Sequence, residues 1–171
     1  MDRRPTRSLG VLPGRVASAK RAQAPMLVDA GAPATRFRRE VLIDAPFHAA
    51  GERLMSWQVQ RSAFRVRSSV PRVTPGAIVE MSPSVLPLRF YCRVTEVIDE
   101  PNRIGFVYAA LPGHPERGEE RFVVERRAGG EVAFVIEAIS RPSTRAWASL
   151  GVLLRAGQEV ITRVCYLRAL G

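Results

Sequence analysis

The chain has 171 residues, of which 46% are hydrophobic and 25% are charged, so it can bury the core of one domain of ordinary size. This composition excludes a wholly disordered protein, and no unbroken run of about 18 apolar residues is present to form a transmembrane helix. No apolar stretch follows the basic N-terminus, which argues against a secretory signal. Two cysteines interpreted as reduced thiols favour a cytoplasmic location.

The formal net charge of +10 is concentrated at the N-terminus. Residues 1–39 carry nine basic and two acidic side chains, whereas residues 40–171 carry 17 basic and 14 acidic ones. Lys20 is the single lysine among 26 basic residues, which indicates a coding bias toward arginine rather than selected phosphate contacts. No helix-turn-helix, zinc-finger or RNP pattern is present, so nucleic acid is not predicted as a partner.

The cysteines and histidines are too scattered to form a structural metal site. Cys92 and Cys165 are 73 positions apart, and His48 and His114 are each isolated. A zinc site needs four ligands at a recognisable spacing. We therefore predict no metal and no cofactor, and we interpret both cysteines as reduced thiols in the core.

Residues 1–35 contain four prolines and no sustained apolar period, so they are predicted to be a flexible, arginine-rich tail. Residues 36–171 are predicted to be a single domain. It begins with a strand over 37–43 and a helix that starts at Asp44-Ala45-Pro46 and ends near Gln60. The apolar residues of this helix follow a spacing of three to four: Phe47, Ala50, Leu54 and Trp57.

Beyond this helix the apolar period is close to two, which is typical of strands. Strands are predicted over 64–67, 77–81, 88–98, 103–110, 119–127 and 131–140. A long final helix is then predicted over 144–170, with an apolar face of Trp147, Leu150, Leu154, Ile161, Val164 and Cys165. The fold class is therefore α+β.

This order of elements resembles the helix-grip architecture of START-type lipid-transfer and polyketide-cyclase-like proteins. The resemblance implies an antiparallel sheet of about seven strands wrapped on the long C-terminal helix, with a cavity between them. Alternation places Phe106, Tyr108 and Phe122 on the side that faces this helix. The same parity places Glu120 on that inner side near the cavity mouth, while a bulge is expected to turn Glu96 outward, because an unpaired buried carboxylate is costly.

The most unusual segment runs from Gly105 to Phe122, with the sequence Gly-Phe-Val-Tyr-Ala-Ala-Leu-Pro-Gly-His-Pro-Glu-Arg-Gly-Glu-Glu-Arg-Phe. Its histidine and glutamates are suited to acid–base chemistry or cation binding, but the same residues also suit a solvated loop. The segment resembles the signature of the domain-of-unknown-function family nineteen-ninety of bacteria and plants. Further residues match that family, including Trp57, Cys92-Arg93-Val94, Ser140-Arg141-Pro142 and Tyr166 to Leu170.

The resemblance covers residues 30–170 and supplies no substrate. Ala109 and Ala110 stand where the family usually has Gly-Thr, so any chemistry of that threonine is absent here. The leading hypothesis is a soluble domain that binds a small, largely apolar molecule in the cavity. The candidate polar groups at its mouth are Tyr108, His114, Glu120 and Arg141. The alternatives are a cyclase, isomerase or hydrolase that uses the same pocket, and a cavity-free interaction domain with a basic tail.

Overall fold

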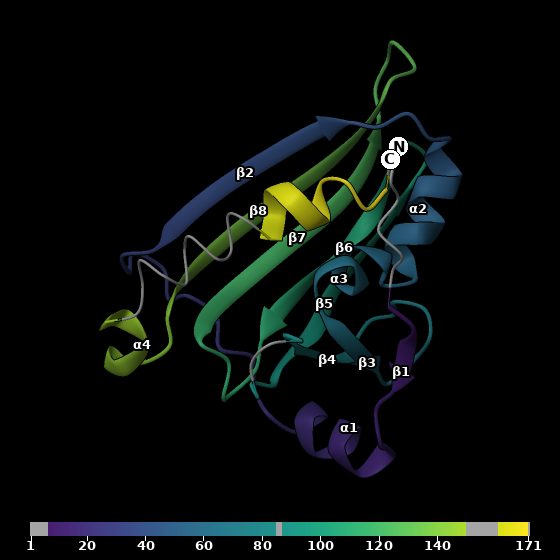
Figure 1. The fold of residues 1–171 in the computed structure, drawn as a ribbon. Coiled ribbons are helices and arrows are strands. Elements are labelled where there is room, and N and C mark those ends of the chain that lie inside the picture. Colours follow the sequence, from purple (N-terminus) through teal and green to yellow (C-terminus); the bar gives the residue numbers. More distant parts are fainter. Residues whose placement is uncertain (1–6, 85–86, 150–160, 171) are drawn as a thin grey trace.

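The computed structural model describes residues 7–84, 87–149 and 161–170. Eight strands among these residues form one sheet in the order β1-β3-β4-β5-β6-β7-β8-β2 (Figure 1). The neighbouring pairs are antiparallel except for the parallel pair β1–β3. The strands are β1 (Leu9–Val11), β2 (Thr35–Leu42), β3 (Arg65–Ser68), β4 (Ile78–Ser82), β5 (Phe90–Glu100), β6 (Arg103–Ala110), β7 (Glu116–Arg126) and β8 (Val132–Pro142). The α+β class is confirmed, and β1 is added to the seven predicted strands.

The helix predicted to end near Gln60 is two helices, α2 (Phe47–Met55) and α3 (Gln58–Ala63). The helical conformation is interrupted at Trp57, whose φ of 64° lies in the left-handed region. That conformation is uncommon for a bulky side chain and is held here by packing, because the Trp57 ring is fully buried against Phe106 at 5.5 Å between centroids. The predicted stripe of Phe47, Ala50 and Leu54 is buried as expected.

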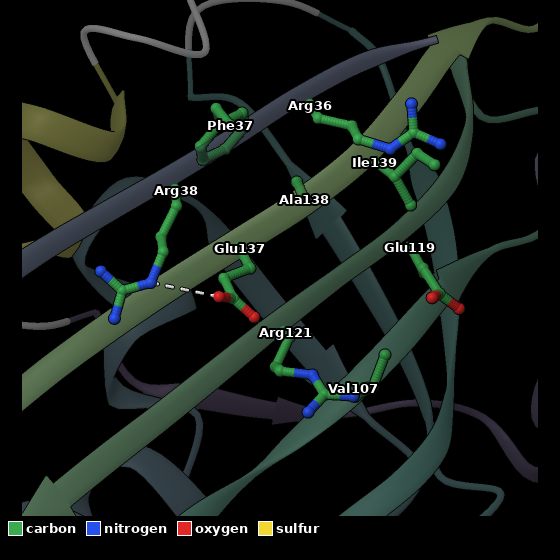
Figure 2. Close-up of a pocket in the computed structure, with 9 residues that line it drawn as sticks. All are labelled: Arg36, Phe37, Arg38, Val107, Glu119, Arg121, Glu137, Ala138 and Ile139. Carbon is green, nitrogen blue, oxygen red and sulfur yellow. Dashed lines mark hydrogen bonds and ion pairs between the residues drawn. The ribbon is translucent and has the colours of Figure 1, made fainter.

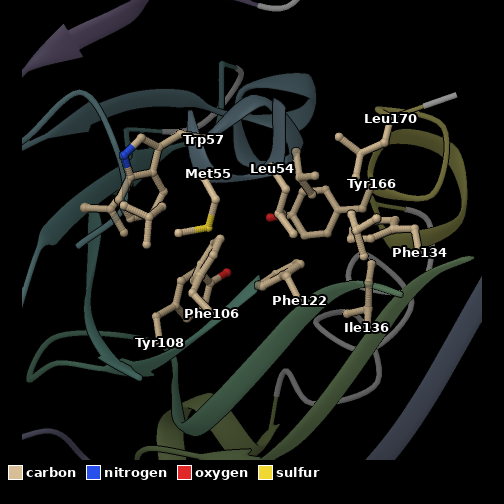
Figure 3. Packing of buried hydrophobic residues seen from close by; sticks show 14 of the residues in the cluster. Leu54, Met55, Trp57, Phe106, Tyr108, Phe122, Phe134, Ile136, Tyr166 and Leu170 are labelled. Atoms are coloured by element: carbon tan, nitrogen blue, oxygen red, sulfur yellow. The ribbon is translucent and has the colours of Figure 1, made fainter. Parts of the chain in front are cut away.

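The main core fills the inner face of the sheet, under α2, α3 and the π-helix η1 (Ile161–Tyr166). Inward-facing rings of adjacent strands touch: Phe106 stacks on Phe122 at 5.4 Å, and Phe122 meets Tyr166 of η1 at 5.7 Å (Figure 3). The even-numbered residues of β6, β7 and β8 supply this face, as alternation predicts. Phe122 therefore lies at the centre of the layer that joins the sheet to the C-terminal segment.

The bulge expected near Glu96 is confirmed. The pairing of β5 with β6 shifts register between Val94 and Glu96, so Glu96 moves to the outer face. There it forms an ion pair with Arg121 at 3.4 Å, and half of its side chain is exposed. The inner face therefore avoids a carboxylate at this position, because one extra residue reverses the alternation.

The N-terminal segment differs from the predicted flexible tail. Leu9–Val11 pair with Val66–Ser68, and the helix α1 (Gly14–Arg21) follows. Leu12 and Ala17 are buried and pack with Ile78 and Leu111 in a second, smaller core. The apolar period was too short to detect, because a three-residue strand and an eight-residue helix bury few side chains between them.

A matched pair of substitutions tests whether this segment contributes to stability. Leu12 is 3% exposed, whereas its neighbour Val11 is 82% exposed. We expect Leu12→Ala to cost about 2 kcal/mol or more and Val11→Ala to stay within about 0.5 kcal/mol. In thermal melts this is a loss of roughly 2–4 °C for each kcal/mol in a domain of this size. Equal melting temperatures for the two variants would show that the segment is not packed.

The predicted final helix over 144–170 is described only at its two ends. Within this range the structure describes the helix α4 (Arg145–Ser149) and η1, after which a C-terminal turn holds the fully buried Leu170. The predicted apolar residues Leu150 and Leu154 lie outside the described residues. Among the helices that the structure describes, none is long and apolar enough to cross a membrane.

Candidate functional site

Two of the predicted site residues, Tyr108 and Glu120, meet on the inner face of the sheet. They are direct partners in the register of β6 and β7. The Tyr108 hydroxyl donates a hydrogen bond to Glu120 Oε2 at 2.9 Å. The ring of Tyr108 also lies 5.3 Å from that of Phe122, so the pair belongs to the aromatic layer of the core. Sequence alternation alone placed both side chains on this face, and the structure confirms it.

The surroundings of Glu120 keep its carboxyl close to half ionised at neutral pH. Burial raises the pKa of Glu120 from 4.5 to about 7, and the hydrogen bond from Tyr108 opposes this rise. The charge of Glu116 raises this pKa further. Burial and then the Glu120 charge raise the pKa of Tyr108 well above its usual value, so the phenol stays protonated as a donor. Glu120 can therefore both take up and release a proton near pH 7.

Two further groups that sequence reasoning did not assign to the site lie near this pair. Burial raises the pKa of both Cys92 and Tyr166, and in each case the Glu120 charge is the next largest cause. Tyr166 comes from η1, so the C-terminal segment brings a polar group to the inner face. The only sequence signal for Tyr166 was the resemblance of the chain's end to the family pattern. Cys92 is a free thiol in the core, as predicted.

His114 is held by its own loop, beside the aromatic layer. Its Nδ1 lies 3.0 Å from the backbone nitrogen and 2.9 Å from the carbonyl oxygen of Glu116. The imidazole ring packs edge-on against Phe90 of β5 at 5.0 Å between centroids. Burial lowers the pKa of His114 to about 4, against the opposing hydrogen bond to Glu116. The ring is therefore neutral at pH 7 and acts as a hydrogen-bonding group rather than a cation.

The N-terminal segment fastens the loop that carries His114. The backbone nitrogen of Met26 donates to the Ala110 carbonyl at 2.7 Å, and the Met26 carbonyl accepts from Gly118 at 2.7 Å. Lys20 approaches the Pro112 carbonyl at 3.4 Å. Residues 20–26 thus bridge the end of β6 and the start of β7, which sets the position of the loop between them.

Arg141 does not join the predicted group. Its guanidinium pairs with Asp29 at 3.0 Å. In β8 residue 141 has the same parity as Glu137 and Ile139, which line a pocket on the outer face. This alternation places Arg141 on the face opposite to Glu120, which pairs with the inward-facing Ala138.

That outer-face pocket is a shallow, charged depression over β2, β8, β7 and β6 (Figure 2). Arg38 reaches Glu137 at 3.2 Å and Glu40 at 2.7 Å, while Arg121 is held by Glu96. Most of its charges are thus matched within the protein on a solvated surface, where ion pairs contribute little. The inner face, with fewer and more buried polar groups, is the stronger candidate site. Within the described residues, no three His, Cys, Asp or Glu side chains are grouped so as to hold a metal ion.

Comparison with known proteins gives the family and the class of fold. The model of the family described as "Domain of unknown function (DUF1990)" matches residues 17–168. A UPF0548 protein of Deinococcus radiodurans is 46% identical over 83 residues, which span 46% of this chain and 41% of that protein. The chain thus spans less than half the length of this curated relative.

Similar solved structures include norcoclaurine synthase from Thalictrum flavum. A point mutant in complex with a transition-state analogue is 9% identical, with a TM-score of 0.57 over 83% of this chain and 97% of that one. The same enzyme in complex with dopamine and hydroxybenzaldehyde is 12% identical, with a TM-score of 0.50 over 84% and 96%. At this identity the likeness shows the fold alone, and these neighbours have helix-grip folds.

Proposed function

The chain belongs to the DUF1990 family, and we propose that it binds a small, largely apolar molecule between the inner face of the sheet and the C-terminal segment. In this proposal the sheet wraps a long C-terminal helix that includes α4 and η1, as in helix-grip proteins. The ligand's apolar body lies against the aromatic layer of Phe106, Phe122 and Tyr166. Such concave apolar surfaces with a few convergent polar groups are the usual form of a small-molecule site.

The hydrogen-bonded pair of Tyr108 and Glu120 is the observation that carries the proposal. Folding gains little from a carboxyl in this place, because burial opposes its ionisation. Among the described residues Glu120 forms no ion pair, and its hydrogen bond with Tyr108 uses only Oε2. The remaining oxygen is available for a hydroxyl or amine of the ligand. His114 forms the rim, and Arg141 is left out.

The fold neighbour supports a small-molecule site in general terms. The norcoclaurine synthase structure contains dopamine and hydroxybenzaldehyde, two small aromatic molecules. The aromatic layer of the present chain offers a similar kind of surface, since edge-to-face and stacked ring contacts favour flat aromatic partners. The ligand class proposed for this chain is therefore flat and apolar, with at least one polar group directed at Glu120.

An enzyme that uses the same site is the second candidate, and the pKa of Glu120 favours it. A carboxyl with a pKa of about 7 is close to the best value for a general acid or base at neutral pH. The Tyr108 phenol, which keeps its proton, would stabilise negative charge that develops on a substrate oxygen. This arrangement suits proton transfer, as in an isomerase or a cyclase.

Native mass spectrometry of freshly purified protein tests ligand binding directly. We expect the parent protein to carry a co-purified small molecule, and Glu120→Gln to lose it. Glu119→Gln is the matched control, because Glu119 is the adjacent carboxylate and is exposed on the outer face. We expect that control to keep the molecule. A bound molecule that survives Glu120→Gln and Tyr108→Phe alike would place the site elsewhere.

A further inference from the structure

One buried side chain of the core is not explained by packing. Gln60 of α3 is fully buried, and within the part of the chain that the structure describes neither its Nε2 nor its Oε1 has a hydrogen-bond partner. Buried amides in native proteins are nearly always paired, since an unpaired group loses its hydration without compensation. An apolar side chain of the same length would fill this place at lower cost.

The geometry of α3 places Gln60 on the side of the helix that faces the interior. Phe64 follows Gln60 by four residues and accordingly shares its side of the helix. The ring of Phe64 contacts Phe90 at 5.4 Å and Tyr166 at 6.4 Å. The other polar side chains of α3 all have backbone partners, because Gln58 donates to the Ala169 carbonyl, Arg61 to the Arg7 carbonyl and Ser62 to the Val59 carbonyl.

Phe64, one helical turn after Gln60, belongs to the same aromatic layer as the neighbours of Glu120. The ring of Tyr166 contacts those of Phe64 and Phe122, and the Phe122 ring in turn contacts that of Tyr108. Two polar groups thus lie at different places along the same apolar surface. The core also contains Met55 and Met81, whose unbranched side chains repack readily and can make room for a guest molecule.

We infer that the Gln60 amide is a second anchor for the ligand proposed above, and that this ligand is a flat, neutral molecule with an N–H donor and a carbonyl acceptor side by side. A lactam or a carboxamide has this arrangement. The Gln60 carbonyl accepts from the ligand N–H, and the Gln60 NH₂ donates to the ligand carbonyl. Neutrality follows from the full burial of Gln60, since a charge placed there would lose its hydration. The inference rests on the proposed function, since it requires a ligand in the interior.

Two probes of the same shape test this inference on the unmodified protein. 2-Quinolinone has the paired N–H and carbonyl, and coumarin has an oxygen in place of that N–H. In isothermal titration calorimetry we expect 2-quinolinone to bind roughly tenfold more tightly than coumarin. The ring oxygen of coumarin cannot donate a hydrogen bond to the Gln60 carbonyl, and the two oxygens repel each other. Equal affinities for the two probes would overturn the role of Gln60 and leave interior binding intact. Failure of both probes to bind a protein that still carries a co-purified molecule in native mass spectra would overturn the inferred ligand class and leave the proposed function standing. Absence of any co-purified molecule as well would contradict the proposed function itself.

Gln60→Met and Gln58→Met are the variant and its matched control. We expect Gln60→Met to abolish the preference for 2-quinolinone and to melt at or above the parent temperature, since it removes two unpaired polar atoms. Gln58→Met is expected to keep the preference and to melt lower, because it removes the hydrogen bond to Ala169. A Gln60→Met protein that keeps the preference, or that fails to fold, would show that the amide serves the structure alone.

Discussion

Gly118→Ala is expected to destabilise the protein severely, although the change adds one methyl group. Gly118 has a φ of +144°, which L-residues with a side chain rarely adopt. A Cβ at this position would lie 2.0 Å from the Ile139 carbonyl oxygen and 2.8 Å from the Ser140 Cα. Both obstacles are backbone atoms of the neighbouring strand, so β7 and β8 would have to separate. We expect a loss of more than about 4 kcal/mol in urea unfolding.

Gly113→Ala is the matched control in the same motif. Gly113 also has a positive φ, of +96°, but an added Cβ would meet nothing within 4 Å. This change therefore carries backbone strain without a clash, at a cost of about 1–2 kcal/mol. Similar losses for the two variants would mean that strand β7 adapts to the methyl group, and that the close approach at Gly118 does not hold the motif in place.

This difference also explains part of the motif that the sequence singled out. Gly118 is needed where β7 crosses close to β8, just before Glu119 and Glu120. In the sequence this glycine comes directly before two carboxylates. The structure adds that it permits the strand pairing that aims Glu120 inward, directly opposite Ala138. The segment from Gly105 to Phe122 therefore contains a residue that shapes the candidate site as well as residues that form it.

The inner face of the sheet could be predicted because strand alternation is a strong, local rule. It placed Tyr108 and Glu120 together, and the cost of a buried carboxylate located the bulge before Glu96. The same rule already gave Arg141 the outward parity, yet its position near a strand end made it look like a mouth residue. Its ion pair with Asp29 depends on the N-terminal segment.

The features that could not be predicted depend on contacts between distant segments. The strand β1 has three residues and takes its place by pairing with β3, more than fifty positions away. The interruption of the helix at Trp57 has no glycine as a sequence signal, because tertiary packing of the Trp57 ring holds the backbone in this conformation. Gln60 falls at the end of a predicted helix, where a glutamine is ordinarily exposed. Only the packing of α3 shows that its amide is buried.

Glu120→Gln is expected to stabilise the folded protein at pH 8 and to have little effect near pH 4. The pKa of Glu120 is about 7 in the folded state and 4.5 without the fold, so the folded protein holds a proton that the unfolded chain releases between these values. Stability therefore falls as the pH rises from about 4.5 to 7, and the loss stays constant above that range. A shift of this size corresponds to at most about 3 kcal/mol, and glutamine does not incur it.

The measurement is a series of thermal or urea unfolding curves from pH 4 to pH 8 for the parent, Glu120→Gln and Glu119→Gln. His114 titrates in this range too, but it is present in all three proteins and cancels in the comparison. We expect the advantage of Glu120→Gln to grow with pH, and Glu119→Gln to show no such trend, because its carboxylate is exposed. An advantage that does not change with pH would mean that Glu120 ionises freely. If the trend appears together with loss of the co-purified molecule, Glu120 lowers stability at neutral pH and serves the ligand, which is the behaviour of a functional carboxyl rather than a structural one.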